Sequence, residues 1–402
     1  MRFLCFRYSF CCIKRREFLS YLASSLAAGV GTCRLNAEVL TSKDPNNNKT
    51  FDQDILKAID ECVHSFMQRR MVPGVSVAFT KDEALVFEKA FGFADVLKLE
   101  PLTSQHRFRI ASVSKPLTSI AVFKLVDAGK LRLSDNVFGV KGILSHRFSS
   151  LRTDSFLDLV TVDDLLTHSV GNWGNDQFDP IDLSLPIDVL ILSVLEKRRL
   201  DKPPGQKFCY SNFGYCLLGR VIEVITKQSY SDSLQNILFS PLGASSFDLS
   251  ASSIKDKKEK EVFYFHQVEG SPYRYNMAAM DSCGGWISTP RDLAKLLVHV
   301  DGFSSKKDIL PLDLIQRMTT PYLDGYARGW FVNRSNNWWH NGRLNGSLSF
   351  VYRGSDGTNI VIFCNTSGDQ DLINSFELFV RDLSLLFSNI KSWPLIDLFS
   401  VS

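Results

Sequence analysis

Residues 108–131 read FRIASVSKPLTSIAVFKLVDAGKL, and this stretch decides the fold. Apolar residues follow Ser112 at helical spacing, and a glycine ends the run, so we expect a helix over 112–128. Pro116 is compatible with this helix only in its first turn. The predicted helix therefore begins at a serine and carries Lys115 one turn later.

Ser112 and Lys115 are three residues apart, so they lie on the same side of a helix. A neutral lysine amine beside a serine hydroxyl can take its proton, and a helix start offers positive amides to the serine. A single S-x-x-K match is typical of a solvated helix face, as expected for Ser252/Lys255, Ser304/Lys307 and Ser388/Lys391. The first copy differs because it opens an apolar helix.

Two further motifs lie downstream. Tyr210 and Asn212 form a Y-x-N motif, and His340 and Gly342 form an H-x-G motif that precedes the strand-like residues 347–352. Taken alone, the first is typical of a core aromatic beside a helix-capping Asn. The second, taken alone, is typical of a turn with a surface histidine.

In this order and spacing, the three motifs resemble the serine β-lactamase and penicillin-binding-protein superfamily, specifically its class C-like branch. The resemblance extends over about residues 52 to 390. It includes VDDLLTHSVG (162–171), PPGQKFCYSNFGYCLLGRVIE (203–223) and GGWISTPRDLAKLL (284–297). The motif order thus favours a functional interpretation that no single motif supports.

The resemblance implies a role for each matching residue. Ser112 is the acylated nucleophile, and Lys115 accepts its proton. Tyr210 is the second general base or acid, which shares the proton with Lys115 and passes it to the leaving group. Asn212 orients Lys115 or the substrate amide.

Strand residues complete the implied site. The backbone N–H groups of Ser112 and Arg343 form the oxyanion hole, and Gly342 leaves room for the substrate. His340 stands where true β-lactamases and transpeptidases usually carry a lysine that helps to hold the substrate carboxylate. A neutral imidazole does this poorly. Related esterases, D-aminopeptidase-like proteins and mitochondrial serine β-lactamase-like proteins show the same exchange of lysine for histidine. Arg343 offers a replacement cation.

Two other matches are interpreted as structural. Ser134-Asp135-Asn136 resembles the S-D-N element of class A enzymes, but it follows Ser112 too closely in the sequence. The HSVG segment at 168–171 departs from the usual HTSG of the family and is interpreted as a turn.

The expected fold is α/β (α+β): an antiparallel sheet flanked by helices and built from both ends of the chain, with an inserted helical domain. Strand-like runs occur near both ends, at 75–80, 84–91, 329–332, 347–353 and 359–364. We expect the sheet domain at 51–133 and 282–390, the mainly helical domain at 134–281 and a tail at 391–402.

The first residues differ in composition from the rest. Residues 14–19 (KRREFL) resemble a twin-arginine export motif, and an uncharged small-residue stretch follows it. We therefore expect a leader over 1–37, a linker over 38–50, and no stable membrane span after leader removal. Mitochondrial import is the alternative, and lipidation at Cys33 stays open.

Composition excludes several other classes. Of 402 residues, 46 are Lys or Arg and 43 are Asp or Glu, so the net charge of +3 indicates no nucleic-acid partner. The seven histidines form no HxH, HExxH or HxxxH pair, and there is no CxxC pair, so no metal or cofactor is expected. No G-x-S-x-G elbow or P-loop occurs. The cysteines after the leader are expected to be buried free thiols.

The sequence thus predicts a metal-independent serine hydrolase that forms an acyl-serine intermediate, most consistent with esters or small amides. The alternatives are a β-lactamase, a D-alanyl carboxypeptidase or D-aminopeptidase, and a catalytically silent binding protein on the same fold. The expected partner is a small ester, amide or peptide, and the oligomeric state is left open. Trp286, Trp338 and Trp339 are expected to line an apolar acyl pocket or to pack in the core.

Overall fold

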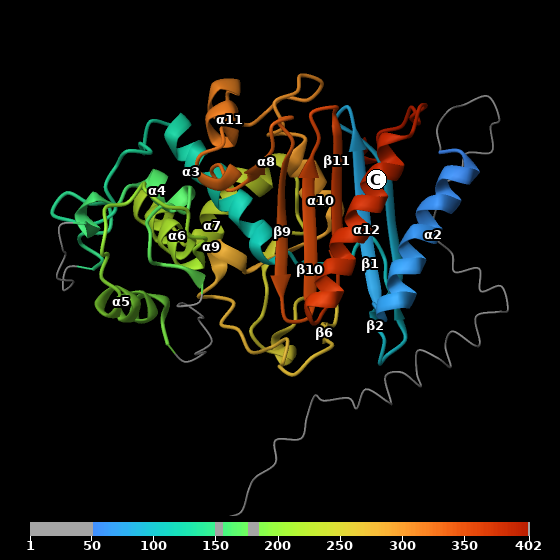
Figure 1. The fold of residues 1–402 in the computed structure, drawn as a ribbon, viewed down its shortest axis with the longest axis horizontal. Coiled ribbons are helices and arrows are strands. Elements are labelled where there is room, and N and C mark those ends of the chain that lie inside the picture. The colour runs from blue at the N-terminus through green and yellow to red at the C-terminus, as the bar shows by residue number, and fades with distance from the viewer. Residues whose placement is uncertain (1–50, 149–155, 176–184, 401–402) are drawn as a thin grey trace, which may run out of the picture. The chain divides into compact units, whose positions relative to one another are not determined.

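The computed structural model of the chain describes residues 51–148, 156–175 and 185–400, so the predicted leader and linker lie outside it. Its central feature is a seven-stranded sheet in the order β3-β2-β1-β11-β10-β9-β8 (Figure 1). All neighbouring strands of this sheet are antiparallel. The strands are β1 (Gly74–Lys81), β2 (Ala84–Asp95), β3 (Glu100–Pro101), β8 (Phe331–Val332), β9 (Trp338–Leu344), β10 (Ser347–Arg353) and β11 (Thr358–Cys364).

The two ends of the chain meet in the middle of this sheet. β1 pairs with β11, so that Val75 lies opposite Cys364. Every residue of β11 is buried, as expected for a strand covered on both faces, which reads as a continuous apolar run. The predicted mixed fold, with a sheet built from both ends of the chain, is therefore confirmed.

One face of the sheet is covered by α2 (Gln53–Arg70) and α12 (Gln370–Ser388), which lie side by side in Figure 1. Aromatic rings fill the space beneath them. Phe66 stacks on Phe379 with ring centroids 4.6 Å apart, and Phe51 and Phe387 belong to the same buried cluster. The two terminal helices thus form one apolar layer.

On the other side of the sheet, α10 (Pro290–Leu297) packs against β1 and β11. The helices of the middle of the chain lie to the side of the sheet where β9 runs (Figure 1). These are α3 (Ser114–Asp127), α4 (Val162–Leu166), α5 (Ile187–Lys197), α6 (Asn212–Thr226), α7 (Tyr230–Leu234), α8 (Ser240–Leu242) and α9 (Asp281–Gly284), with α11 (Leu312–Thr319) further along the chain. Among the described residues, no helix is both long and apolar enough to cross a membrane.

Helix α3 is enclosed by these elements. Eleven of its fourteen residues are buried, which explains why its sequence is apolar on all sides. Its buried hydroxyls donate to neighbouring backbone: Thr118 donates to Ser282 O at 2.6 Å, and Ser119 donates to Arg328 O at 2.6 Å. Burying α3 therefore leaves these polar groups with partners.

The segment before α3 is anchored by a small sheet in the order β4-β7-β5. These strands are β4 (Phe108–Arg109), β7 (Trp286–Ser288) and β5 (Asp248–Leu249). The buried Arg109 guanidinium donates to Ser250 Oγ and Ala251 O, both at 2.8 Å, and to Pro272 O. The backbone entering the candidate site is held by both strand pairing and a buried cation.

The expected helix over 112–128 is divided in the structure. A 3-10 turn, η2 (Ala111–Val113), comes first, and α3 begins at Ser114. Pro116, which has no N–H to donate, therefore stands in the first turn of α3, as its chemistry requires. The proposed division at residues 133/134 and 281/282 stays a prediction.

Candidate active site

Ser112 lies in η2, where the sheet meets α3, and its side chain is half-buried. The carbonyl groups just before it are fixed by β10: Ser349 Oγ donates to Ile110 O at 2.7 Å, and Ser347 Oγ donates to Arg109 O. Ala111 has a φ of +47°, a left-handed conformation that costs a non-glycine residue about 1–2 kcal/mol. The surrounding hydrogen bonds hold the nucleophile candidate in this turn.

Lys115 is fully buried beside Ser112. Its Nζ lies 3.0 Å from Ser112 Oγ, 2.7 Å from Asn212 Oδ1 and 2.9 Å from Cys283 O. All three partners are uncharged, and no salt bridge within the described part of the chain includes Lys115. Asn212 Oδ1 and Cys283 O therefore hold the amine beside the serine hydroxyl, and neither acceptor is a carboxylate.

Tyr210 and Asn212 reach the lysine from the start of α6. Lys115 Nζ lies 4.7 Å from the centroid of the Tyr210 ring. The helix begins here because Ser211 caps it, accepting from Gly214 N at 3.0 Å. The backbone N–H of Asn212 donates to Asn175 Oδ1 at 2.7 Å. The structure thus brings Ser112 from η2, Lys115 from the start of α3, and Tyr210 and Asn212 from the start of α6 together.

His340 lies on β9, buried, with its ring centroid 6.3 Å from that of Tyr210. Its Nδ1 lies 2.7 Å from Asn341 O, which can only accept, so Nδ1 carries the proton. Nε2 then accepts from the Tyr326 hydroxyl at 3.3 Å. Burial and the charge of Lys115 lower the pKa of His340 to about 3. The imidazole is therefore neutral at neutral pH and offers no cation to a substrate.

Gly342 and Arg343 follow on β9 and face opposite sides of it. A Cβ added at Gly342 would lie 2.3 Å from Ile110 O and 2.2 Å from Ser349 Oγ, so only glycine fits against the turn that holds Ser112. Arg343 is exposed, and its guanidinium donates to Gly368 O at 3.3 Å. Its predicted oxyanion and carboxylate roles stay predictions.

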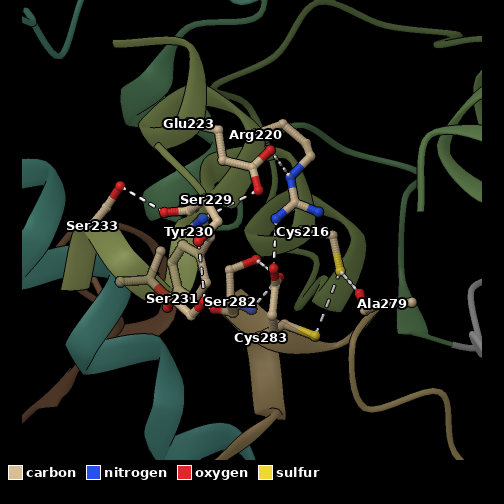
Figure 2. A network of polar contacts seen from close by, with 12 residues as sticks. Cys216, Arg220, Glu223, Ser229, Tyr230, Ser231, Ser233, Ala279, Ser282 and Cys283 are labelled. Carbon is tan, nitrogen blue, oxygen red and sulfur yellow. Dashed lines mark hydrogen bonds and ion pairs between the residues drawn. The ribbon is translucent and has the colours of Figure 1, made fainter. Parts of the chain in front are cut away.

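The backbone carbonyl that holds Lys115 belongs to α9, and a buried polar network fixes this helix (Figure 2). Arg220 on α6 forms salt bridges with Asp281 at 2.6 Å and with Glu223 at 3.0 Å. The thiols of Cys216 and Cys283 point toward one another with their sulfurs 3.6 Å apart, and their hydrogen bond raises the pKa of Cys216. The network joins α6 and α9, which carry two of the three partners of Lys115.

Three contacts of the site were not predicted. A motif of side chains cannot predict a contact made by the backbone carbonyl of Cys283, although the adjacent GGW stretch indicates close packing. Tyr326 has no local signal at all, because only the fold brings it to His340. His168, interpreted above as part of a turn, is buried with its ring centroid 4.3 Å from that of Tyr210.

Two of the three tryptophans follow the expectation of core packing. Trp286 and Trp338 are core residues, and for Trp339 the expectation of an acyl pocket stays a prediction. Trp339 is half-buried and stacks on Phe331 at 5.9 Å, beside His340. Burial, which was expected for all five cysteines after the leader, is found for Cys216, Cys283 and Cys364, whereas Cys62 and Cys209 are half-buried.

The remaining motifs contribute no metal cluster or second base. Asn136 of the S-D-N match pairs with Thr161 in an isolated bridge and donates to Asp158 O, and neither belongs to the Ser112 site. Within residues 51–148, 156–175 and 185–400, no group of three His, Cys, Asp or Glu side chains is arranged to hold a metal ion.

A family model described as Beta-lactamase matches residues 59–377. Among curated proteins, Protein flp of Staphylococcus aureus (strain N315) is 26% identical over 329 residues, covering 74% of this chain. The chain spans 60% of the length of that relative.

Solved structures share the fold. D-amino acid amidase from Ochrobactrum anthropi SV3 superposes with a TM-score of 0.70 at 22% identity, over 84% of this chain and 99% of the amidase. EstCE1, a hydrolase with promiscuous acyltransferase activity, gives 0.67 at 17% identity, over 82% of this chain and 98% of its own. At these identities the likeness shows a common architecture.

Proposed function

The chain belongs to the beta-lactamase family of serine hydrolases, and we propose that it hydrolyses esters or small amides through an acyl-enzyme on Ser112. One observation carries the proposal: the buried Lys115 amine lies 3.0 Å from Ser112 Oγ and is held there by two uncharged acceptors. This is the arrangement of a nucleophile with an oriented base.

In the acylation step, Lys115 in its unprotonated form takes the hydroxyl proton of Ser112. The Oγ then bonds to the substrate carbonyl carbon, and the carbonyl π electrons move to the oxygen. When this oxyanion collapses, the bond to the leaving alcohol or amine breaks, and that group takes a proton delivered through Tyr210. Water attacks the acyl-enzyme in the second half, releasing the acid and restoring Ser112.

Charge on the carbonyl oxygen needs donors in the transition state. We assign this role to the backbone N–H groups of Ser112 and Arg343, because β9 packs against η2 and Gly342 permits the close approach. A lost donor of this kind typically costs about 3–4 kcal/mol of transition-state stabilisation.

The neutral His340 favours substrates that need no cation for a carboxylate. Its Nε2 is already engaged by Tyr326, and its ring centroid lies 5.6 Å from that of the apolar Phe331 ring. The fold neighbours include an amidase and a hydrolase with acyltransferase activity, which supports ester or amide chemistry. The β-lactamase and D-alanyl carboxypeptidase alternatives rest on Arg343 binding a carboxylate instead, whereas the D-aminopeptidase alternative is compatible with the neutral His340.

Covalent labelling tests the proposal. A fluorophosphonate probe should modify Ser112 of the wild type, and Ser112→Ala should lose both labelling and ester turnover with an unchanged melting temperature. Ser304→Ala is the matched control, because Ser304 opens an S-x-x-K match in an exposed segment. Turnover retained by Ser112→Ala would refute the assignment, and an unlabelled, inactive wild type would favour the silent binding protein.

A panel of substrates separates the alternatives. Short-chain p-nitrophenyl esters, a chromogenic cephalosporin and D-alanyl peptides would be compared by kcat/KM, with a metal chelator as an additional condition. We expect the esters to be preferred and the chelator to leave the rate unchanged.

The location of the protein in the cell also stays a proposal. We infer export through the twin-arginine-like leader, with mitochondrial import as the alternative. Fractionation of a tagged full-length chain, with and without replacement of Arg15 and Arg16 by lysine, distinguishes the two.

A further inference from the structure

His168 contacts the backbone on both sides of Tyr210. Its carbonyl accepts from Cys209 N at 2.7 Å, and its Nδ1 accepts from Ser211 N at 3.1 Å. Cys209 and Ser211, the residues before and after Tyr210, are therefore both hydrogen-bonded to His168. A clamp of this kind fixes the direction in which the intervening side chain leaves the backbone.

The hydrogen bonds define the state of the ring. Because Nδ1 accepts a hydrogen bond, the neutral ring carries its proton on Nε2. Nε2 is buried and has no hydrogen-bond partner among the described residues. Leaving a buried donor unpaired costs about 1–3 kcal/mol. Burial, followed by the charges of Lys115 and His340, lowers the pKa of His168 well below its usual value, so the acceptor at Nδ1 persists.

The backbone of His168 is unfavourable too. Its φ is +57°, in the left-handed region, where a histidine is uncommon. His168, which is 1% exposed, therefore has both an unpaired buried donor and an unfavourable backbone conformation. Strain of this kind persists only where the surroundings enforce it, and it gathers at functional sites.

The ring also contacts the side chains of the site. Its centroid lies 4.3 Å from that of Tyr210, 4.7 Å from that of Tyr326 and 5.0 Å from that of Tyr215. Lys115 Nζ lies 4.7 Å from the centroid of the same Tyr210 ring. The histidine ring and the lysine amine together limit where the Tyr210 ring can lie.

We propose that His168 is a positioning residue that holds the Tyr210 phenol in place for proton transfer, acting through the clamp on Cys209 and Ser211 and through ring contact. The proposal rests on the role given to Tyr210 under the proposed function. His168 itself makes no bond to substrate. Its removal loosens the start of α6, and a misplacement of about 1 Å can cost about 100-fold in rate.

Two substitutions separate the clamp from simple packing. His168→Asn keeps a side-chain acceptor near the place of Nδ1, and asparagine tolerates the left-handed backbone. His168→Leu keeps similar bulk and loses the acceptor. We expect His168→Leu to lower kcat for a p-nitrophenyl ester about 100-fold with little change in KM. His168→Asn should recover most of that loss.

A double-mutant cycle with Tyr210→Phe shows whether the effect passes through the tyrosine. If it does, adding His168→Leu to Tyr210→Phe should cost less than about threefold, because the phenol is already absent. Melting temperatures of all variants provide the folding control. Equal losses in both backgrounds would overturn the proposal.

The asparagine variant keeps the proposal falsifiable if His168→Leu does not fold: a 100-fold loss in a folded His168→Asn would also overturn it. Failure here is distinct from failure of the proposed function. If Ser112→Ala loses labelling while His168→Leu keeps the wild-type kcat, the acyl-enzyme mechanism stands and only the role of His168 falls.

Discussion

At the scale of single residues, the site depends on uncharged hydrogen-bond partners around Lys115 and on a neutral imidazole at His340. Lys115 has three uncharged partners, and the neutral His340 donates from Nδ1 and accepts at Nε2. Burial supplies the main cause of the low His340 pKa, and the Lys115 charge adds to it. An imidazolium at this position would have no carboxylate partner among its hydrogen bonds and would lose the bond from Tyr326.

The low pKa of His340 makes the free energy of unfolding depend on pH, and it fixes the direction of that dependence. The pKa of His340 falls from 6.5 to about 3 on folding. Between these values the unfolded chain binds a proton that the folded chain does not, so the free energy of unfolding decreases as pH falls. His340→Gln should flatten this slope by up to about 1.4 kcal/mol per pH unit. Urea unfolding of both proteins from pH 7 to pH 3.5 measures it.

The quantity to compare is the difference in unfolding free energy between His340→Gln and the wild type at each pH. Burial also raises the pKa of Asp301 to about 6 and that of Asp308 to about 7, and these carboxyls stabilise the fold as pH falls. Both carboxyls are present in the wild type and in His340→Gln, so their contributions cancel in the difference. Parallel slopes for wild type and His340→Gln would contradict the burial argument.

At the scale of elements, the position of Lys115 depends on how closely α6 and α9 approach. The two helices hold Lys115 through Asn212 Oδ1 and Cys283 O. Gly219 on α6 allows the contact, because a Cβ there would lie 2.4 Å from Ser282 Oγ. The buried Arg220–Asp281 salt bridge, 2.6 Å long, then links the two helices.

Gly219→Ala should therefore lower both stability and kcat. The added methyl group pushes α9 away, which costs about 1–3 kcal/mol of unfolding free energy and moves the Cys283 carbonyl from Lys115. Gly214→Ala is the control in the same helix, since its Cβ would meet nothing closer than 3.6 Å. Thermal unfolding and ester turnover of the two variants are the measurements. Equal behaviour of both would show that the helix contact does not limit the site.

At the scale of the whole folded unit, the sheet separates two cores. The layer of α2 and α12 covers one face, and the Ser112 turn lies with α3 against the elements of the other core. Stability contributed by the terminal helices should therefore be independent of the geometry around Ser112 and Lys115.

Phe66→Ala tests this separation. Removing the buried ring that stacks on Phe379 should cost about 3–5 kcal/mol of unfolding free energy. The kcat of the folded fraction should stay unchanged below the transition. Leu378→Ala on α12 is the control, because Leu378 is 49% exposed and should change stability by less than about 0.5 kcal/mol. A matching fall in kcat for Phe66→Ala would contradict the independence of the two faces.

The sequence by itself determined several of the strands and the identity of the main polar groups, but it missed the division between η2 and α3. Residues 347–353 and 359–364 alternate or run apolar strongly enough to predict strands, and β10 and β11 lie there. Ser112, Lys115, Tyr210 and His340 were found by motif order, which needs no coordinates. Local periodicity and turn chemistry carry this information because neighbours in the chain decide it.

Only the tertiary structure decided what surrounds these groups. The Cys283 carbonyl on Lys115, the Tyr326 hydroxyl on His340 and the ring of His168 against Tyr210 come from segments distant in the chain. Burial, which makes His340 neutral and leaves Trp286 and Trp338 in the core, likewise follows from packing. The physical reason is that desolvation and through-space contact depend on which segments meet, and no local pattern records that meeting.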